Sequence, residues 1–486
     1  MEVELKLDLG DASAEAIRQS NLLPGETTSV RQSSTYYDTP DRALLQAGLS
    51  LRLRRTPGQC IQTIKAVGGS AAGLFTRAEW EQAVDGQHPV LAETDPIATL
   101  LGAATSDLAP VFEIEVDRRI WRVNEGEAEI ELVMDRGAAS SGDDRVSICE
   151  VELELARGPV AALFALARKL DEVAPVRLGV RTKAERGYGL SPRKRRPFKA
   201  EPVVLAHGMN AAEAFQRSAQ ACIRHFRLNE DLVLDDRAAG AGPLHQARVA
   251  LRRLRSAFSI YRPLLDGDPV GERLREELRW LSGQLGEARN LDVLIERGEP
   301  GALQERLLAE RSAAYGRVTA ALGSPRVRAM MLDLAEWLIA GEWLSNAETQ
   351  ARRSQPAREF AAARLDRLRR RLKKDGDSLD SDGDEARHEV RKDAKRLRYA
   401  AEFFGGLFDR KRERRRYKAF IADLEDLQDR LGALNDLATA PEVLRGLGIA
   451  DNPEAALLLV DANKPALVKA AAKAHAALVD AKRFWR

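Results

Sequence analysis

The sequence has few cysteines and aromatic residues, and its opposite charges almost cancel. Cys60, Cys149 and Cys222 lie far apart in the chain and form no Cys-x-x-Cys pair. This spacing argues against a disulfide framework and against a thiolate zinc site, and it favours reduced thiols in a cytoplasmic protein. The formal net charge of +2 predicts no partner, so the local distribution of charge has to indicate one.

Long apolar runs are also missing. No stretch approaches the roughly 20 apolar residues that a membrane-spanning helix needs, and the N-terminus begins with a charged pattern rather than a signal peptide. We therefore expect a soluble protein without a membrane partner. No glycine-rich Walker loop and no Ser/His/Asp arrangement stands out. At 486 residues the chain is long enough for two or three domains.

Strands with one ionic face are abundant in the first third of the chain. Charged and apolar residues alternate in Met1-Glu2-Val3-Glu4-Leu5-Lys6, and the alternation returns at 51–54, 79–81, 129–132 and 150–155. A single strand of this kind would simply face solvent, because strand side chains alternate between two faces. So many of them predict an antiparallel closed β-barrel with surrounding helices, whose ionic faces line a tunnel.

The predicted tunnel mixes carboxylates with arginines and lysines. Carboxylate oxygens ligate hard divalent cations, and basic groups hold phosphate oxygens. The mixture is therefore suited to a polyanion that is bound together with a divalent metal ion. A competing interpretation is that some of these side chains only form structural salt bridges with each other.

A series of motifs resembles the CYTH domain, also called the triphosphate tunnel metalloenzyme family, over roughly residues 1–190. The first is Glu2-Val3-Glu4-Leu5-Lys6, which matches the ExExK signature of that family. The others follow in the family's order at 36–41, 51–54, 63–65, 77–81, 117–118, 131–137, 149–154 and 183–188. The resemblance implies a barrel that binds metal and hydrolyses triphosphate.

Residue type and resemblance together assign expected roles in the tunnel. The resemblance implies metal ligation by Glu2, Glu4, Glu150 and Glu152, with Mg²⁺ or Mn²⁺ as the ion. The ligating members of Glu150, Glu152 and Glu154 are left open. The expected phosphate-binding residues are Arg52, Arg54, Lys65, Arg118, Lys183 and Arg186, with Arg31 as a further candidate. The catalytic candidates are Lys6, Glu4, Glu79 and Glu81. Glu131 and Asp135 complete the set of acidic residues in the tunnel.

A basic segment framed by two prolines, 191–199, separates two kinds of sequence. It has the composition of an interdomain linker, and the alternatives are a phosphate contact or a nucleic-acid patch. We therefore divide the chain into domains 1–200 and 205–486. The second domain contains long helical periodicities without strand patterns, so we expect an all-α bundle.

The helical domain contains an internal duplication. His245-Gln246-Ala247-Arg248 continues to Arg255, and His388-Glu389-Val390-Arg391 continues to Arg398; the elements that begin at Leu285 and Leu431 also match. The offsets, 388 − 245 = 143 and 431 − 285 = 146, are nearly equal. Repetition of two elements at one spacing predicts two similar helical halves.

Each copy places its basic residues on one narrow helical face, at about 100° per residue. A solvated face is the ordinary interpretation of such a pattern. Here the faces are almost free of acids, so the charges repel each other unless an anion neutralises them. The two faces consist of His245, Arg248, Arg252 and Arg255 in the first copy, and His388, Arg391, Lys395 and Arg398 in the second.

The duplicated pattern resembles the CHAD domain, a helical module that binds inorganic polyphosphate, over roughly residues 210–486. The whole chain then resembles bacterial CYTH-CHAD inorganic triphosphatases. The expected function is metal-dependent hydrolysis of triphosphate to pyrophosphate and phosphate, with a second domain that holds polyphosphate. We do not expect nucleic acid as a partner, because the basic faces lack interleaved aromatics. The alternatives are an adenylate cyclase, a nucleoside or thiamine triphosphatase, and a non-catalytic polyphosphate-binding adaptor.

Overall fold

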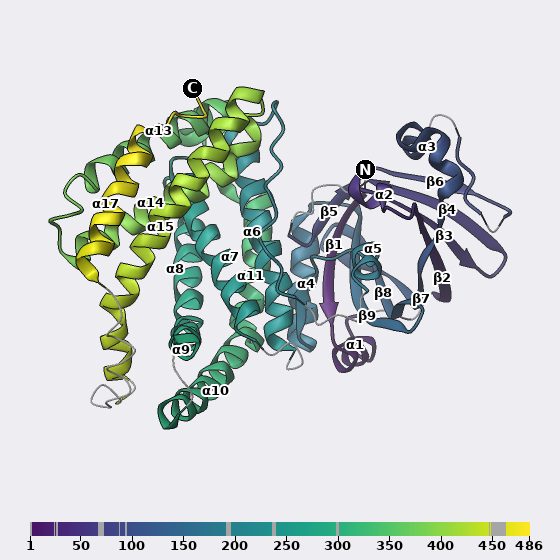
Figure 1. Ribbon diagram of the computed structural model, residues 1–486. Coiled ribbons are helices and arrows are strands. Elements are labelled where there is room, and N and C mark those ends of the chain that lie inside the picture. The colour runs from purple at the N-terminus through teal and green to yellow at the C-terminus, as the bar shows by residue number, and fades with distance from the viewer. Residues whose placement is uncertain are drawn as a thin grey trace. The chain divides into compact units, whose positions relative to one another are not determined.

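The computed structural model describes residues 2–23, 25, 28–66, 72–86, 88–92, 95–190, 196–235, 240–297, 301–446, 448 and 463–486. These residues form two compact units (Figure 1). The first unit contains residues 1–196 together with 323–340, and the second contains 197–322 and 341–486. The sequence-based division into 1–200 and 205–486 stays a prediction, and the contacts add a separate helical segment to the first unit.

The first unit is built on an antiparallel sheet. In the part of the chain that the structure describes, ten strands are hydrogen-bonded in the order β10-β1-β9-β8-β7-β2-β3-β4-β6, with β5 paired to β1. The strands are β1 (Glu2–Leu9), β2 (Thr28–Asp38), β3 (Leu49–Thr56), β4 (Gln59–Ala66), β5 (Leu74–Arg77), β6 (Glu79–Ala83), β7 (Ala109–Glu125), β8 (Ala128–Ser141), β9 (Asp144–Arg157) and β10 (Val176–Leu178).

The sheet curls into a barrel that is closed only in part (Figure 1). Strands β5 and β6 follow each other with Ala78 between them. Residues of β5 pair with β1, as in Glu4 with Phe75, whereas residues of β6 pair with β4, as in Lys65 with Glu79. The predicted fully closed barrel is therefore corrected. The segment 74–83 pairs first with β1 and then with β4. Its hydrogen bonds to β1 therefore close only part of the gap between β1 and β4.

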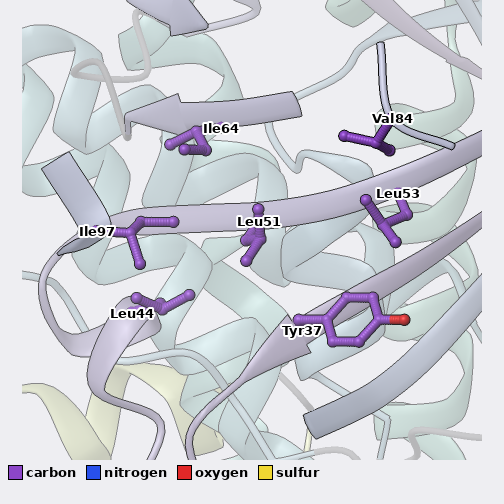
Figure 2. Close-up of a cluster of buried hydrophobic side chains, with 7 residues drawn as sticks. All are labelled: Tyr37, Leu44, Leu51, Leu53, Ile64, Val84 and Ile97. Atoms are coloured by element: carbon purple, nitrogen blue, oxygen red, sulfur yellow. The ribbon is translucent and has the colours of Figure 1, made fainter. Parts of the chain in front are cut away.

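The alternation of apolar and ionic residues is confirmed by the packing of β3 and β4. Leu51, Leu53 and Ile64 are buried in a core cluster that also contains Tyr37, Leu44, Val84 and Ile97 (Figure 2). The intervening side chains of Arg52 and Arg54 therefore project to the other face of the sheet. Burial of the leucine side chains stabilises this orientation by about 2 kcal/mol for each side chain.

Helices cover the outer side of the sheet. Helix α4 buries Leu163, Phe164, Leu166 and Leu170. Helix α11 packs against α4 and β10, and Arg328 Nε donates to Asp171 Oδ1 over 2.6 Å. The helices of this unit are α1 (Asp11–Arg18), α2 (Ala43–Gln46), α3 (Pro96–Leu101), α4 (Ala161–Val173), α5 (Lys183–Tyr188) and α11 (Pro325–Ala340).

The second unit is all-helical in its described residues, as predicted. The apolar residues of the first repeat that lie off its basic face, Leu251, Leu254, Phe258 and Tyr261, are all buried. The long helices are α6 (Ala211–Leu234), α7 (Ala241–Ile260), α8 (Pro269–Gln284), α9 (Gly286–Arg297), α10 (Ala302–Gly323), α13 (Ala357–Asp375), α14 (Asp384–Phe404), α15 (Lys411–Gly446) and α17 (Lys464–Asp480), and α12 (Gln350–Arg353) is a single turn.

The two repeats correspond to α7 and α14, each followed by its second matching element. In the first copy a break at Leu285 separates α8 from α9. In the second copy the corresponding element lies inside the continuous α15. The repeat is therefore conserved in its charged helix and differs in the segment that supports it.

Candidate functional sites

The ionic face of β1 and β9 buries a lysine among carboxylates. Lys6 Nζ donates to Glu150 Oε1 over 2.9 Å and to Glu152, and it lies 3.6 Å from Glu4 Oε1. The register explains the grouping, because Lys6 is directly opposite Glu152 in the antiparallel pair. Figure 1 shows β1 and β9 side by side.

Helix α5 brings a second lysine to the same carboxylates. Thr182 and Glu185 form a capping box, in which each side chain accepts from the backbone N–H of the other residue. This cap starts the helix at Lys183, whose Nζ lies 2.8 Å from Asp135 Oδ2, 2.5 Å from Glu150 Oε1 and 2.7 Å from Glu152 Oε1. The following turn carries Arg186, which pairs with Asp8 and lies 3.6 Å from Glu150 Oε2.

Asp135 is the member of this cluster that the sequence interpretation placed only in the general acidic set. It is fully buried, and Arg118 donates to both of its oxygens, over 2.9 and 2.6 Å. One oxygen from each of Asp135, Glu150 and Glu152 lies within 4.8 Å of the others. The three carboxylates could therefore hold a metal ion. The pairing of Asp135 with Glu150 across β8 and β9 places it there, and the sequence alone does not fix this register.

The charges in this cluster stabilise each other. Burial disfavours the ammonium form of Lys183, but Asp135, Glu150 and Glu152 outweigh burial and raise its pKa well above the ordinary value. Burial disfavours the carboxylate of Glu152, but Lys183, Lys6 and Arg118 hold its pKa well below the ordinary value. The cluster is thus fully ionised near neutral pH.

One carboxylate oxygen of the cluster lacks a hydrogen-bond donor. Glu150 Oε2 is buried and accepts no hydrogen bond from any residue that the structure describes, and its cationic neighbour is Arg186 Nε at 3.6 Å. Because an unsatisfied buried carboxylate oxygen is costly, and because hard divalent cations prefer such oxygens, the residues present fit Mg²⁺ or Mn²⁺. Glu4 lies beside the cluster and is 6% exposed. The side chain of Glu2 is outside the described residues.

The phosphate-binding candidates on β3 and β4 lie on a more open part of the same face. Lys65 Nζ is 2.8 Å from Glu79 Oε2, and Arg54 Nη2 is 3.1 Å from Glu81 Oε1. Arg52 is 4.0 Å from Glu79 and close enough to Arg118 for the two charges to interact. These cations therefore border the carboxylate cluster. Arg31 does not join them, since its side chain is 77% exposed beside Glu115.

The motif at 36–41 has a structural role in this geometry. The Asp38 carboxylate accepts from the backbone N–H groups of Leu44 and Leu45 over 2.9 and 3.1 Å, which anchors the start of α2. It also accepts from the Tyr188 hydroxyl over 2.8 Å. Asp38 thereby fixes the end of α5, the helix that positions Lys183.

The second unit contains a basic groove of about 420 Å³ between α7, α8 and α14. Arg252, Arg255, His388, Arg391 and Lys395 line it, so five of the eight predicted anion-binding residues are brought together. His245, Arg248 and Arg398 do not line it. The lining residues that the sequence interpretation missed are Ser256, Ser259, Arg275, Arg279, Lys392, Arg396 and Tyr399. Ser256 and Ser259 continue the stripe of Arg252 and Arg255 at helical spacing, which is the signal that was available.

In the second repeat the matching element contacts the charged helix, whereas in the first repeat the end of α8 does so. His388 Nδ1 lies 2.6 Å from Asn435 Oδ1, and Arg248 Nη1 donates to the backbone oxygen of Ser282 over 3.1 Å. Burial and the charge of Arg289 lower the pKa of His245 to about 4. With this lowered pKa, His245 is neutral near pH 7 and contributes no cation to the groove.

Mutual repulsion marks the groove as a site for an anion. Among the described residues, no carboxylate forms an ion pair with Arg252 or Arg255. Burial and the charges of Arg391 and Arg252 lower the pKa of Lys395 to about 7. These cations repel each other although Asp436 and Glu276 offset part of their charge, and a bound polyanion would relieve the repulsion.

Two family models match the chain. The CYTH domain model matches residues 1–188, and the CHAD domain model matches residues 217–445. The chain contains a CYTH domain followed by a CHAD domain. The α11 segment of the first structural unit falls within the range matched to the CHAD domain.

Individual relatives are distant. The CYTH domain is similar to an inorganic triphosphatase of Haemophilus influenzae, with 28% identity over 198 residues, which cover 40% of this chain and 56% of that protein. An uncharacterized protein of Mycobacterium tuberculosis is 27% identical over 449 residues, or 82% of each chain. The crystal structure of a CHAD domain from Ricinus communis is 29% identical, with a TM-score of 0.49 over 59% of this chain and 97% of that one.

The structure also bears on membrane association. Among the described residues, no helix is both long enough and apolar enough to span a bilayer.

Proposed function

We propose that the CYTH domain is a metal-dependent inorganic triphosphatase that hydrolyses triphosphate to pyrophosphate and phosphate. The supporting observation is the buried cluster of Asp135, Glu150 and Glu152, bordered on one ionic face by arginines and lysines. Phosphoryl transfer depends mainly on positioning and charge neutralisation, and this face supplies both. The similarity to the Haemophilus influenzae triphosphatase supports the same reaction.

We assign the roles from the geometry as part of this proposal. Asp135, Glu150 and Glu152, with Glu4 beside them and Glu2 in the same strand, would hold Mg²⁺ or Mn²⁺. The metal ion, when bound, supplies a Lewis acid for the phosphoryl oxygens. Arg52, Arg54, Lys65 and Arg118 bind the outer phosphate oxygens, Lys6 and Lys183 neutralise charge near the ion, and Glu79 and Glu81 orient Lys65 and Arg54 and position water.

The alternatives are other triphosphate-processing enzymes of the same family and a protein that binds polyphosphate without hydrolysing it. An adenylate cyclase or a nucleoside or thiamine triphosphatase needs a surface for a base or ring, whereas the described cluster is made of charged side chains. A non-catalytic polyphosphate adaptor does not need three ionised carboxylates beside the phosphate-binding cations. These observations favour inorganic triphosphate as the substrate.

A substrate panel tests this proposal. The protein is incubated with triphosphate, ATP and thiamine triphosphate, each with Mg²⁺, with Mn²⁺ or with chelator, and both released phosphate and cyclic AMP are measured. We expect the fastest release from triphosphate and none with chelator. Preferential turnover of ATP, or formation of cyclic AMP, would favour the alternatives.

We also propose that the CHAD domain binds inorganic polyphosphate in the groove of α7, α8 and α14. The supporting observation is the convergence of cations from both repeats on one cavity. A polyanion long enough to contact both helices gains from every phosphate that it places there. Such binding weakens with salt, because counterions are released from the polyanion. The cytoplasmic location expected from the three scattered thiols is part of the same proposal.

A further inference from the structure

The two repeats are inequivalent one turn beyond their shared basic faces. The offset of 143 residues relates Arg255 to Arg398, and it also relates Ser259 to Glu402, since 402 − 259 = 143. The first copy therefore ends its basic stripe on a small neutral residue. The second copy ends it on a carboxylate.

The neutral end of the stripe is open. Ser259 and Arg255 both line the groove, next to Arg275 and Arg279 of α8. No carboxylate among the described residues forms an ion pair with Arg255, whose side chain is exposed. An anion can therefore reach this guanidinium group directly.

The acidic end is occupied by an internal partner. Glu402 Oε1 lies 3.0 Å from Arg398 Nε, and Glu402 Oε2 pairs with Arg253. Arg398 also lies over the ring of Tyr399, at 5.8 Å from its centroid, and Tyr399 lines the groove. Arg398 is thus adjacent to the groove but does not line it, and it shares the carboxylate of Glu402 with Arg253.

We propose that Glu402 terminates the polyphosphate-binding groove by withholding Arg398 from the bound chain. This inference rests on the proposed binding of polyphosphate by the CHAD domain. The carboxylate repels phosphates that extend past Lys395 and competes for the guanidinium group that would bind them. The bound chain therefore runs from Lys395 toward Arg255 and α8, and Glu402 sets how many phosphates the groove holds.

Two variants of the full chain test the proposal from opposite ends. Glu402→Gln removes the charge of the stop and keeps its shape, while Ser259→Glu places a carboxylate at the related open position. Binding of polyphosphates of defined length is measured by calorimetry in chelator, which prevents turnover. We expect Glu402→Gln to bind long chains several-fold more tightly, with no change for short chains. We expect Ser259→Glu to bind all chains at least ~10-fold more weakly.

A third variant shows whether Arg398 carries the gain. Arg398→Gln is expected to change binding little in the wild-type background and to abolish the gain in Glu402→Gln, because only the freed guanidinium group reaches the phosphates. Thermal melting reports folding of each variant. Because Glu402 also pairs with the buried Arg253, Ser259→Glu decides the outcome if Glu402→Gln does not fold.

The outcomes separate the two proposals. No binding of polyphosphate by the wild-type protein would refute the proposed function itself. If the wild-type protein binds polyphosphate and folded Glu402→Gln shows the same dependence of affinity on chain length, only the proposed role of Glu402 would be refuted. Unchanged affinity of Ser259→Glu for polyphosphate would also refute that role.

Discussion

At the scale of single residues, Asp135 links the carboxylates that we propose as metal ligands with the cations that we propose to bind phosphate. It accepts from Arg118 and contacts Lys183 within one buried cluster. The sequence could predict that Glu150 and Glu152 face the same side as Lys6, because alternation sets the face of each residue. It could not rank Asp135 above the other acids, since that depends on the register between β8 and β9.

Neutralising Asp135 is expected to abolish most of the activity. Asp135→Asn keeps the size of the side chain and removes a charge that Arg118 and Lys183 now balance, so we expect kcat for triphosphate to fall about 100-fold or more. Phosphate release at saturating metal measures the effect. Asp117→Asn, which changes an exposed carboxylate on β7, is the matched control. Equal loss in both variants, or near-normal turnover in Asp135→Asn, would contradict a role in the site.

Lys395 is expected to give the proposed polyphosphate binding a pH dependence. Its pKa is about 7 in the free protein, and a bound polyanion restores the proton. Affinity therefore falls as pH rises above about 7, by at most ~10-fold per pH unit for one proton. Calorimetry in buffers of different ionisation enthalpy measures proton uptake. Lys395→Arg keeps the charge and is expected to flatten the profile; an unchanged slope would show that another group titrates.

The same residue affects folding with the opposite sign. The lowered pKa means that the unfolded chain holds a proton that the free folded protein has lost, between about pH 7 and the ordinary lysine value of 10.5. Stability of the free protein therefore rises with pH across this window. A protein saturated with polyphosphate lacks this rise, because Lys395 stays protonated in both states.

Among the secondary-structure elements, helix α5 has a start signal in the sequence but no periodic pattern that predicts its length. Thr182-Lys183-Ala184-Glu185 is a capping-box pattern, but the short helix that follows has too few apolar residues for a periodic signal. The alternation at 79–81 belongs to a segment that divides into β5 and β6 at Ala78. Alternation of apolar and charged residues predicts that this segment is a strand. The change of partner from β1 to β4 depends on how the sheet curls.

Removing the cap of α5 is expected to impair catalysis beyond its effect on stability. Thr182→Ala loses the hydrogen bond to the N–H of Glu185 and costs about 1 kcal/mol. It also loosens the helix that places Lys183. Asn210→Ala removes the equivalent cap of α6 in the second unit and serves as the control. We expect similar changes in melting temperature but a fall in kcat only for Thr182→Ala; equal kcat values would refute the positioning role.

At the scale of the whole molecule, the sequence predicted both domain types but not the placement of α11. The buried residues of α11 include Val327, Met330, Leu332 and Leu334, which lie on several sides of the helix. An apolar pattern of this width shows that a helix is enclosed and does not identify its neighbours. The sequence therefore predicts two domains that are each continuous in the chain and meet at the linker. The contacts of α11 with α4 depend on tertiary packing, which the pattern does not specify.

A fragment that ends near residue 200 is expected to keep the site but lose stability. All proposed CYTH site residues precede the linker, whereas α11 and its ion pairs with α4, such as Arg168 with Asp333 at 2.7 Å, would be absent. Exposure of the α4 surface should lower the melting temperature by several degrees. A fragment that carries residues 323–340 on a flexible linker is the control. Identical melting of the two fragments would show that α11 contributes nothing.

The most direct test of the central claim is a metal titration of triphosphate hydrolysis by the wild-type protein and by Glu152→Gln. Glu152 contacts Lys6, Lys183 and Arg118 and belongs to the three-carboxylate cluster. The proposed function predicts that wild-type hydrolysis requires Mg²⁺ or Mn²⁺ and that folded Glu152→Gln loses most turnover at any metal concentration. Hydrolysis that persists in chelator, or that Glu152→Gln retains at the wild-type rate, would contradict a metal-dependent triphosphatase in this barrel.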